Sequence, residues 1–198
     1  MGVSEDMARA LLLKNEWNHE IALKNFTEDF DYIQNTFGFE IGANPVPSGD
    51  DEVLCPVCFC DYPPSEFIFL EDCGHGLCET CYAGYLTSKA GDGVESVLTV
   101  CPEQKCNMIV PERLFAQLLE PQLYQRYKDF LLKSFVDLSK QAKWCPGRDC
   151  GQCVEYKGGN PIDVQCDKCF KTFCFACAKD AHMPMDCDGL QVWQDRIN

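Results

Sequence analysis

Cysteine and histidine, the residues that bind soft metal ions, stand in two clusters along this 198-residue chain. The first cluster offers eight candidate ligands in four close pairs: Cys55 and Cys58, Cys73 and His75, Cys78 and Cys81, and Cys101 and Cys106. A structural zinc site takes four such ligands in a tetrahedron, whereas a catalytic zinc site keeps one position for water. Eight ligands therefore predict two closed zinc sites with a structural role.

A second cluster offers another eight candidate ligands: Cys145, Cys150, Cys166, Cys169, Cys174, Cys177, His182 and Cys187. The expected cofactor is therefore zinc, four ions in all. Two of the sixteen cysteines are left over, Cys60 and Cys153. Cys153 makes a CxxC with Cys150 and competes with it as a ligand. Cys60 is expected to be a passive thiol, because a free cysteine usually behaves as a small apolar side chain.

So many cysteines in a short chain imply either disulfides or metal. A disulfide framework needs a secretory route, but Glu5 and Asp6 stand where a signal peptide carries positive charge. No stretch approaches the roughly 20 apolar residues of a membrane span. We therefore expect reduced, zinc-bound cysteines in the cytoplasm or the nucleus, and no membrane partner.

The chain is strongly acidic, with a formal net charge of −14. Binding of four dications by fourteen thiolates would bring the charge to about −20, since each ligating thiol loses its proton. Zinc proteins that bind nucleic acid need a basic face to displace counterions from phosphates. The charge disfavours the hypothesis of a nucleic-acid-binding zinc protein and favours a protein partner.

The N-terminal residues 4–33 are predicted to form a helical hairpin. Ser4 and Asn18 can each cap a helix, and Trp17 between the two helices is expected to fill a small core. The apolar residues recur at helical spacing, which gives two predicted stripes: Ala8, Leu11 and Leu12, then Ile21, Ala22 and Phe26. Residues 42–52 carry prolines, glycines and acids without a period, which predicts a linker.

Beyond the linker, the chain is predicted to form small zinc-stapled α+β modules. A unit of about fifty residues buries too little apolar surface to be stable alone, and a zinc site adds roughly 10–16 kcal/mol. The expected elements are strands at 67–70 and 97–100, a helix at 79–90, helices beginning near Pro111 and Pro121, and strands at 154–156 and 162–164 joined by a turn at 158–161.

The ligand order of the first cluster resembles the RING finger. The resemblance implies interleaved pairs, so that Cys55, Cys58, Cys78 and Cys81 hold one ion, while Cys73, His75, Cys101 and Cys106 hold the other. The second cluster, with its Trp144-Cys145-Pro146 start and its spacing, resembles the in-between-RING (IBR) zinc domain. There the pairs are used consecutively, which implies one site of Cys145, Cys150, Cys166 and Cys169 and another of Cys174, Cys177, His182 and Cys187.

The two clusters in this order resemble the RING-IBR-RING (RBR) E3 ubiquitin ligases of the Ariadne type. The Trp17-Asn18 turn resembles, in part, the ubiquitin-associated-like (UBA-like) domain of those ligases. The resemblance implies these domains: a partial UBA-like helical segment at 1–41, the linker at 42–52, a first RING finger at 53–110, connecting helices at 111–143, an IBR zinc domain at 144–188 and the start of a linker helix at 189–198.

In this family the first RING recruits a conjugating enzyme charged with ubiquitin. Ubiquitin then passes to a catalytic cysteine in a second RING and from there to a protein substrate. Only eleven residues follow Cys187 and none is cysteine, so we expect no catalytic residue and no second RING in this chain, and no activity of the chain alone. The alternative hypothesis is a non-catalytic adaptor that docks a conjugating enzyme or ubiquitin.

The resemblance also implies where the conjugating enzyme docks. The expected apolar contacts are Val57 between the first two ligands, Tyr82 just after Cys81 and Pro102 just after Cys101. Asn107 follows the last ligand, at a position where RINGs that discharge ubiquitin directly often carry arginine. Asparagine lacks the charge and the reach of arginine, which favours delivery of ubiquitin to a cysteine.

Overall fold

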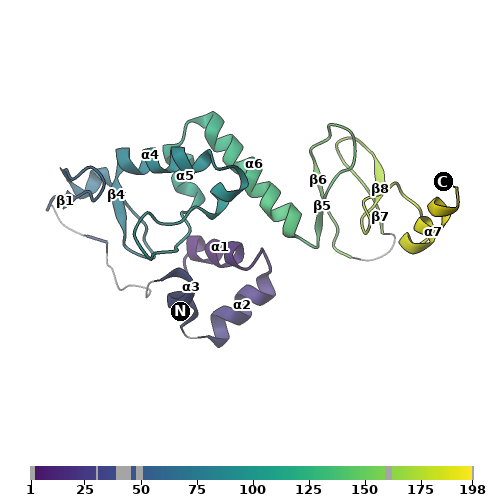
Figure 1. Ribbon diagram of the computed structural model, residues 1–198, viewed down its shortest axis with the longest axis horizontal. Coiled ribbons are helices and arrows are strands. Elements are labelled where there is room, and N and C mark those ends of the chain that lie inside the picture. Colours follow the sequence, from purple (N-terminus) through teal and green to yellow (C-terminus); the bar gives the residue numbers. More distant parts are fainter. Residues whose placement is uncertain (1–2, 30, 39–45, 48–50, 159–161, 198) are drawn as a thin grey trace. The chain divides into compact units, whose positions relative to one another are not determined.

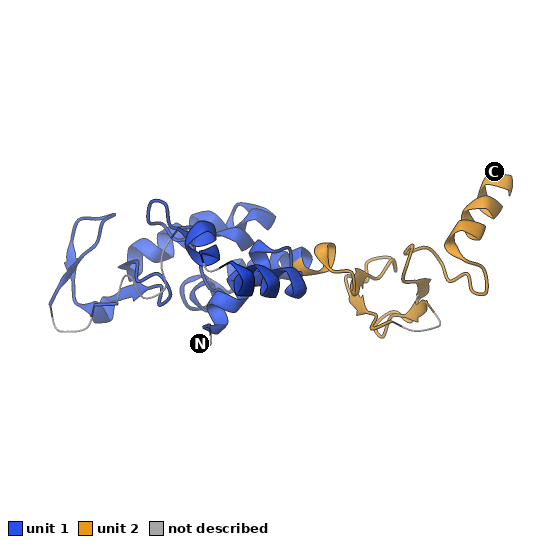
Figure 2. Cartoon of the chain, turned by 90° about the horizontal axis from the view of Figure 1, so that it is seen from below, with its two compact units in different colours: residues 1–134 blue, residues 135–198 orange. Residues whose placement is uncertain are grey.

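The computed structural model describes residues 3–29, 31–38, 46–47, 51–158 and 162–197. Figure 1 shows the helices and the four two-stranded antiparallel sheets found in these residues. The chain divides into two compact units, Met1–Ser134 and Phe135–Asn198 (Figure 2). Most of the predicted linker at 42–52 and of the predicted turn at 158–161 lies outside the described residues.

The N-terminal segment forms three helices, α1 (Glu5–Lys14), α2 (His19–Glu28) and α3 (Tyr32–Phe37). The two predicted caps are confirmed: Ser4 accepts a hydrogen bond from the Met7 backbone, and Asn18 accepts from the first turn of α2. The predicted stripes are only partly right. The buried residues of α1 are Met7, Ala10, Leu11 and Leu13, and Ile21 of α2 is 48% exposed.

The first zinc cluster lies among short elements: β1 (Val53–Leu54), β2 (Asp61–Tyr62), a 3-10 turn η1 (Pro64–Glu66), β3 (Phe67–Phe69), β4 (Gly76–Cys78), helix α4 (Glu79–Ala90) and a 3-10 helix η2 (Gly93–Leu98). Strand β1 pairs with β2, and β3 pairs with β4. The predicted strand at 97–100 is wrong for most of its length. Local hydrogen bonds from Ser96 to Gly93 and from Thr99 to Ser96 close the backbone into η2 instead.

Two helices follow, α5 (Glu112–Leu118) and α6 (Pro121–Leu138). The Phe115 and Tyr127 rings stack with their centroids 3.9 Å apart, and both side chains are buried. They belong to one core that also takes in residues of α1, of α4 and of the first zinc cluster. The N-terminal helices are tied to α6 as well, because the Trp17 indole N–H donates to the Ser134 hydroxyl at 3.2 Å.

The second unit contains β5 (Ala142–Trp144), β6 (Cys153–Glu155), β7 (Asp163–Gln165), β8 (Thr172–Cys174) and helix α7 (Cys187–Ile197). Strand β5 pairs with β6 and β7 pairs with β8. The strands predicted near 154 and 163 are present as β6 and β7, and each has another strand as its partner. The main cluster of buried apolar residues in this unit is small: Cys145, Cys150, Cys166 and Phe173, with Val154 and Val164 packed against it.

Candidate metal centres and an adjoining pocket

The sixteen predicted ligands come together as four groups of four: Cys55, Cys58, Cys78 and Cys81; Cys73, His75, Cys101 and Cys106; Cys145, Cys150, Cys166 and Cys169; and Cys174, Cys177, His182 and Cys187. Within each group, one ligand atom from every residue lies within 4.8 Å of the others. These sets coincide with the interleaved and consecutive pairs expected from the sequence. Each group can hold one zinc ion.

Tight backbone turns aim the paired sulfurs at a common point. In the first group the Phe59 N–H donates to the Cys55 carbonyl at 2.9 Å, and Phe59 adopts the left-handed conformation (φ 58°). Phe170 does the same after Cys169, with φ 60° and a 2.8 Å bond to the Cys166 carbonyl. A left-handed non-glycine residue is strained. A second backbone hydrogen bond closes each turn, from the Cys55 N–H to the Cys60 carbonyl and from the Cys166 N–H to the Lys171 carbonyl.

The spacing of the ligand atoms suits tetrahedral zinc. Zn–S bonds of about 2.3 Å at tetrahedral angles place two sulfurs about 3.8 Å apart. The Sγ···Sγ distances are 3.9 Å for Cys58 and Cys78, 3.5 Å for Cys145 and Cys169, 3.6 Å for Cys150 and Cys166, and 3.8 Å for Cys174 and Cys187. The donor set of thiols and imidazoles is also the one that zinc prefers. All four groups therefore fit the ion.

The two histidines present different ring nitrogens to their groups. In the second group His75 Nδ1 lies 3.7 Å from the Cys101 sulfur. In the fourth group His182 Nε2 lies 3.4 Å from Cys177 Sγ and 3.7 Å from Cys187 Sγ. His182 Nδ1–H donates to the Met185 carbonyl at 2.7 Å. That bond fixes the tautomer with the Nε2 lone pair free for a metal, and sequence reasoning did not find it.

The thiols within one four-cysteine group differ in pKa. In the first group burial, followed by hydrogen bonds to Cys78 and Cys58, raises the pKa of Cys81 to about 12. Burial also acts on Cys55, but hydrogen bonds from backbone N–H groups outweigh it and lower the pKa of that thiol to about 6. Crowded sulfurs oppose one another's ionisation, and a divalent cation removes that opposition.

The two remaining cysteines stand outside the four groups. Cys60 is exposed, and its thiol contacts the Cys58 carbonyl at 3.5 Å. Cys153 is half-buried in β6, paired with Trp144. Cys150, and not Cys153, lies in the third group.

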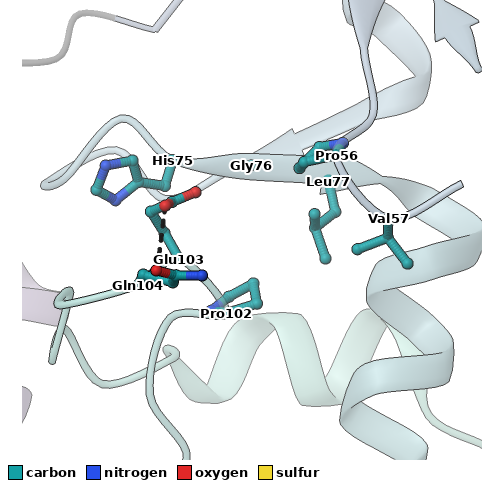
Figure 3. A pocket seen from close by; sticks show the side chains of 8 residues that line it. All are labelled: Pro56, Val57, His75, Gly76, Leu77, Pro102, Glu103 and Gln104. Carbon is teal, nitrogen blue, oxygen red and sulfur yellow. Dashed lines mark hydrogen bonds between the residues drawn. The ribbon is translucent and has the colours of Figure 1, made fainter. Parts of the chain in front are cut away.

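A cavity of about 240 Å³ opens between the first two ligand groups. It is lined by Pro56, Val57, His75, Gly76, Leu77, Pro102, Glu103 and Gln104 (Figure 3). Val57 is 57% exposed and Leu77 is almost fully buried. Two of the three predicted docking residues, Val57 and Pro102, therefore line one pocket, and sequence reasoning missed Pro56 and Leu77 beside them.

Tyr82 does not belong to this surface, which corrects the expectation from the sequence. Its side chain is 0% exposed, and it lies on the buried face of α4 with Leu86 and Ala90. Burial, and then the charges of the Cys101 and Cys73 sulfurs, raise the pKa of its phenol. Its hydroxyl has no hydrogen-bond partner within the described part of the chain. Tyr82 belongs to the same buried core as Cys73, Cys101 and Cys106 of the second ligand group.

A family model matches the part of the chain that contains the third and fourth ligand groups. Residues 125–187 match the family described as "IBR domain, a half RING-finger domain". The chain is 32% identical to "Probable E3 ubiquitin-protein ligase ARI11" of Arabidopsis thaliana over 196 residues, which cover 98% of this chain and 36% of that protein. The chain belongs to the Ariadne type of RBR proteins.

Other Ariadne-type relatives agree over similar lengths. "Probable E3 ubiquitin-protein ligase rbrA" of Dictyostelium discoideum is 32% identical over 98% of this chain and 38% of its own. "Probable E3 ubiquitin-protein ligase ARI9" of Arabidopsis thaliana is 38% identical over 71% of this chain and 26% of its own. The chain thus spans less than two fifths of these relatives.

A solved structure also shows a likeness. It is Parkin of Pediculus humanus bound to phospho-ubiquitin, 24% identical, with a TM-score of 0.46, and the match covers 76% of this chain and 57% of that one. Among the residues that the structure describes, no helix is long and apolar enough to cross a membrane.

Proposed function

We propose that this chain is the part of an RBR-type E3 ubiquitin ligase that recruits a ubiquitin-charged conjugating enzyme. The observation that carries the proposal is the pocket between the first two ligand groups, which Pro102 and the exposed Val57 both line. The relatives are named as E3 ubiquitin-protein ligases. These names support the class of activity, and the pocket supports the proposed position of docking.

The pocket suits an apolar anchor with a polar rim. Leu77 lies on its floor and Pro56 and Val57 on one wall, while Glu103 and Gln104 stand at the rim (Figure 3). The walls belong to loops that zinc would hold at both ends, so little conformational entropy is lost when a partner side chain enters. A surface this small fits a transient complex. A transient complex suits a ligase, because a conjugating enzyme that has given up its ubiquitin must be replaced by a charged one.

The transfer chemistry needs an accessible thiolate. Ubiquitin would pass from its thioester on the conjugating enzyme to a catalytic cysteine of a second RING, then to a lysine of the protein substrate. Fourteen of the sixteen cysteines of this chain lie in the four ligand groups. We therefore assign the catalytic cysteine to a second RING outside the 198 residues and give this chain the docking role.

Several finer assignments belong to the same proposal. The first RING is placed at 53–110 and the IBR zinc domain at 144–188, with connecting helices at 111–143. The segment 1–41 is proposed to be UBA-like, supported by its three short helices and its Trp17-Asn18 turn. The site of action is proposed to be the cytoplasm or the nucleus, where thiols stay reduced.

Substitution of Val57 by aspartate tests docking. The new charge would face an apolar contact without removing a ligand, and an unpaired charge buried in an interface is costly. We expect the wild-type chain to bind at least one of a panel of purified conjugating enzymes, with a Kd of roughly 1 μM, or ~−8 kcal/mol. Val57→Asp should weaken that binding at least tenfold in an NMR titration.

Leu98→Asp is the matched control. Leu98 is 51% exposed, close to the exposure of Val57, but it does not line the pocket. It should therefore keep wild-type affinity. Equal effects of the two substitutions would place docking elsewhere. Binding that depends on Val57 without any ligase activity of the longer protein would instead favour the non-catalytic adaptor.

A further inference from the structure

One short loop connects the pocket to the N-terminal helices. The loop runs from Cys101 to Asn107. Its residues Pro102, Glu103 and Gln104 line the pocket (Figure 3). The next three residues, 105–107, contact the end of α3 instead. The loop therefore has one side toward the proposed docking partner and one side toward the N-terminal segment.

The contacts on the N-terminal side are close and specific. The Asn107 backbone N–H donates to the Phe37 carbonyl at 2.7 Å, and the Phe37 side chain is 0% exposed. Gly38 ends α3 in the left-handed conformation, with φ 78°. A Cβ at this position would collide with the Lys105 carbonyl oxygen and lie 3.8 Å from the Cys106 Cα. Glycine is required both by the backbone angle and by the space.

Cys101 and Cys106, two proposed zinc ligands, would hold the loop near both of its ends, and between them the loop has few other restraints. Lys105 is left-handed, with φ 66°, a conformation that costs energy for a residue with a side chain. Within the loop the Cys106 N–H donates to the Glu103 carbonyl at 3.2 Å, and at its start the Cys101 N–H donates to the Met108 carbonyl at 2.7 Å. The side chains of Glu103 and Gln104 are exposed. The contact with α3 thus adds to the restraint that the two proposed ligands give this segment.

We propose that Phe37 and Gly38 are positioning residues for the docking pocket. They hold the strained end of the loop, and this sets where Pro102, Glu103 and Gln104 stand. The inference rests on the proposed docking function. It makes the affinity for a conjugating enzyme depend on helices that line no part of the pocket, so a ligand that displaced α3 would also weaken docking.

Gly38→Ala tests the proposal in the zinc-loaded chain. The probe is a conjugating enzyme that the wild-type chain binds, chosen from the panel above. We expect native mass spectrometry to show the same zinc content as the wild type. We expect Kd to rise at least fivefold and the amide NMR signals of Glu103 and Gln104 to move. Phe37→Leu, a milder change, should shift both readouts the same way and serves if Gly38→Ala does not fold.

Ala22→Gly in α2 is the control for a merely structural role. Ala22 is buried in the same helical segment, and glycine destabilises a helix without touching the loop. It should lower the melting temperature yet leave Kd and the Glu103 and Gln104 signals unchanged. Wild-type Kd in folded Gly38→Ala or Phe37→Leu would overturn the proposal, and so would an equal loss in Ala22→Gly.

The two proposals fail in different ways. If the wild-type chain binds no conjugating enzyme, or if Val57→Asp binds like the wild type, the docking function falls and this inference falls with it. If Val57→Asp abolishes binding while the two α3 variants retain it, only the positioning role is wrong.

Discussion

The hydroxyl of Ser4 joins the start of α1 to the carboxylate of Asp72. It accepts the Met7 N–H at 2.9 Å and donates to the carboxylate oxygens of Asp72, also at 2.9 Å. Asp72 immediately precedes the ligand Cys73. Burial, together with the charges of nearby acids, raises the pKa of Asp72 although Ser4 acts to lower it. One side chain therefore caps a helix and restrains a zinc loop.

Ser4→Ala should destabilise the first unit. Loss of a helix N-cap typically costs about 1 kcal/mol, and Asp72 would lose a donor in a partly desolvated position. Thermal unfolding of the zinc-saturated protein would measure the change as a lower melting temperature. Ser4→Thr keeps the hydroxyl and should stay close to the wild type. If the alanine variant were as stable as the wild type, water would have to replace the hydrogen bonds of the Ser4 hydroxyl without loss of stability.

Removal of His182 should cost one zinc ion. His182→Ala leaves the fourth group with three ligands, whereas His182→Cys keeps four and should keep the ion. Native mass spectrometry would count four zinc ions in the wild type and in His182→Cys, and three in His182→Ala. His19→Ala is the control, because His19 begins α2 and belongs to no ligand group. Four ions in His182→Ala would exclude this histidine as a ligand.

Chelation of zinc should affect the two units differently. The main buried cluster of the second unit is small, and three of its four members are proposed ligands, so without metal this unit has little apolar surface to bury. The first unit has a larger core that includes the Phe115–Tyr127 stack. We expect a strong chelator to collapse the NMR dispersion of residues 142–187 while circular dichroism retains part of the helix signal. Dispersed signals from a metal-free second unit would contradict the zinc dependence.

The ligand residues could be predicted from the sequence because close pairs of cysteine and histidine are a local pattern, and the resemblance to RING and IBR domains supplied the grouping of the pairs. Strand pairing could not be predicted in this way. The sequence predicted that a glycine-rich turn joins the strands near 154 and 163, without giving the partner of either strand. In the structure each strand pairs across its own ligand turn, β5 with β6 around Cys145 and Cys150, and β7 with β8 around Cys166 and Cys169. The turns that carry the ligand pairs, and not the glycine-rich turn, therefore determine which strands pair.

Two other differences had signals in the sequence. Tyr82, Leu86 and Ala90 are spaced four residues apart, and all three are 0% exposed. This helical spacing indicates a buried face of α4. It was a better guide to Tyr82 than its position directly after the ligand Cys81. Helix α3 was missed, although Gly38 stands where a helix commonly ends. Its contact with the loop at 105–107 depends on segments about seventy residues apart, which no local pattern predicts.

The environment of the two cysteines outside the ligand groups favours inert thiols. Cys60 is exposed and contacts the Cys58 carbonyl. Cys153 lies in the β5–β6 ladder, with the ion pair of Lys157 and Glu155 nearby in sequence. Nucleophilic thiols in enzymes are activated by an adjacent base. Of the three histidines in the chain, His75 and His182 lie in ligand groups and His19 begins α2.

The chain by itself should therefore form no thioester with ubiquitin. A sulfur that donates its lone pairs to zinc cannot attack a carbonyl, and neither remaining thiol has a histidine assigned to it as a base. The test is a non-reducing gel of the zinc-loaded chain incubated with charged conjugating enzyme, beside Cys60→Ala, Cys153→Ala and the double variant. All four proteins should show the same band pattern, with no ubiquitin adduct of the chain that a thiol reductant removes. An adduct of the wild type that disappears in one single variant would identify that cysteine as a nucleophile and make this chain a catalyst in its own right.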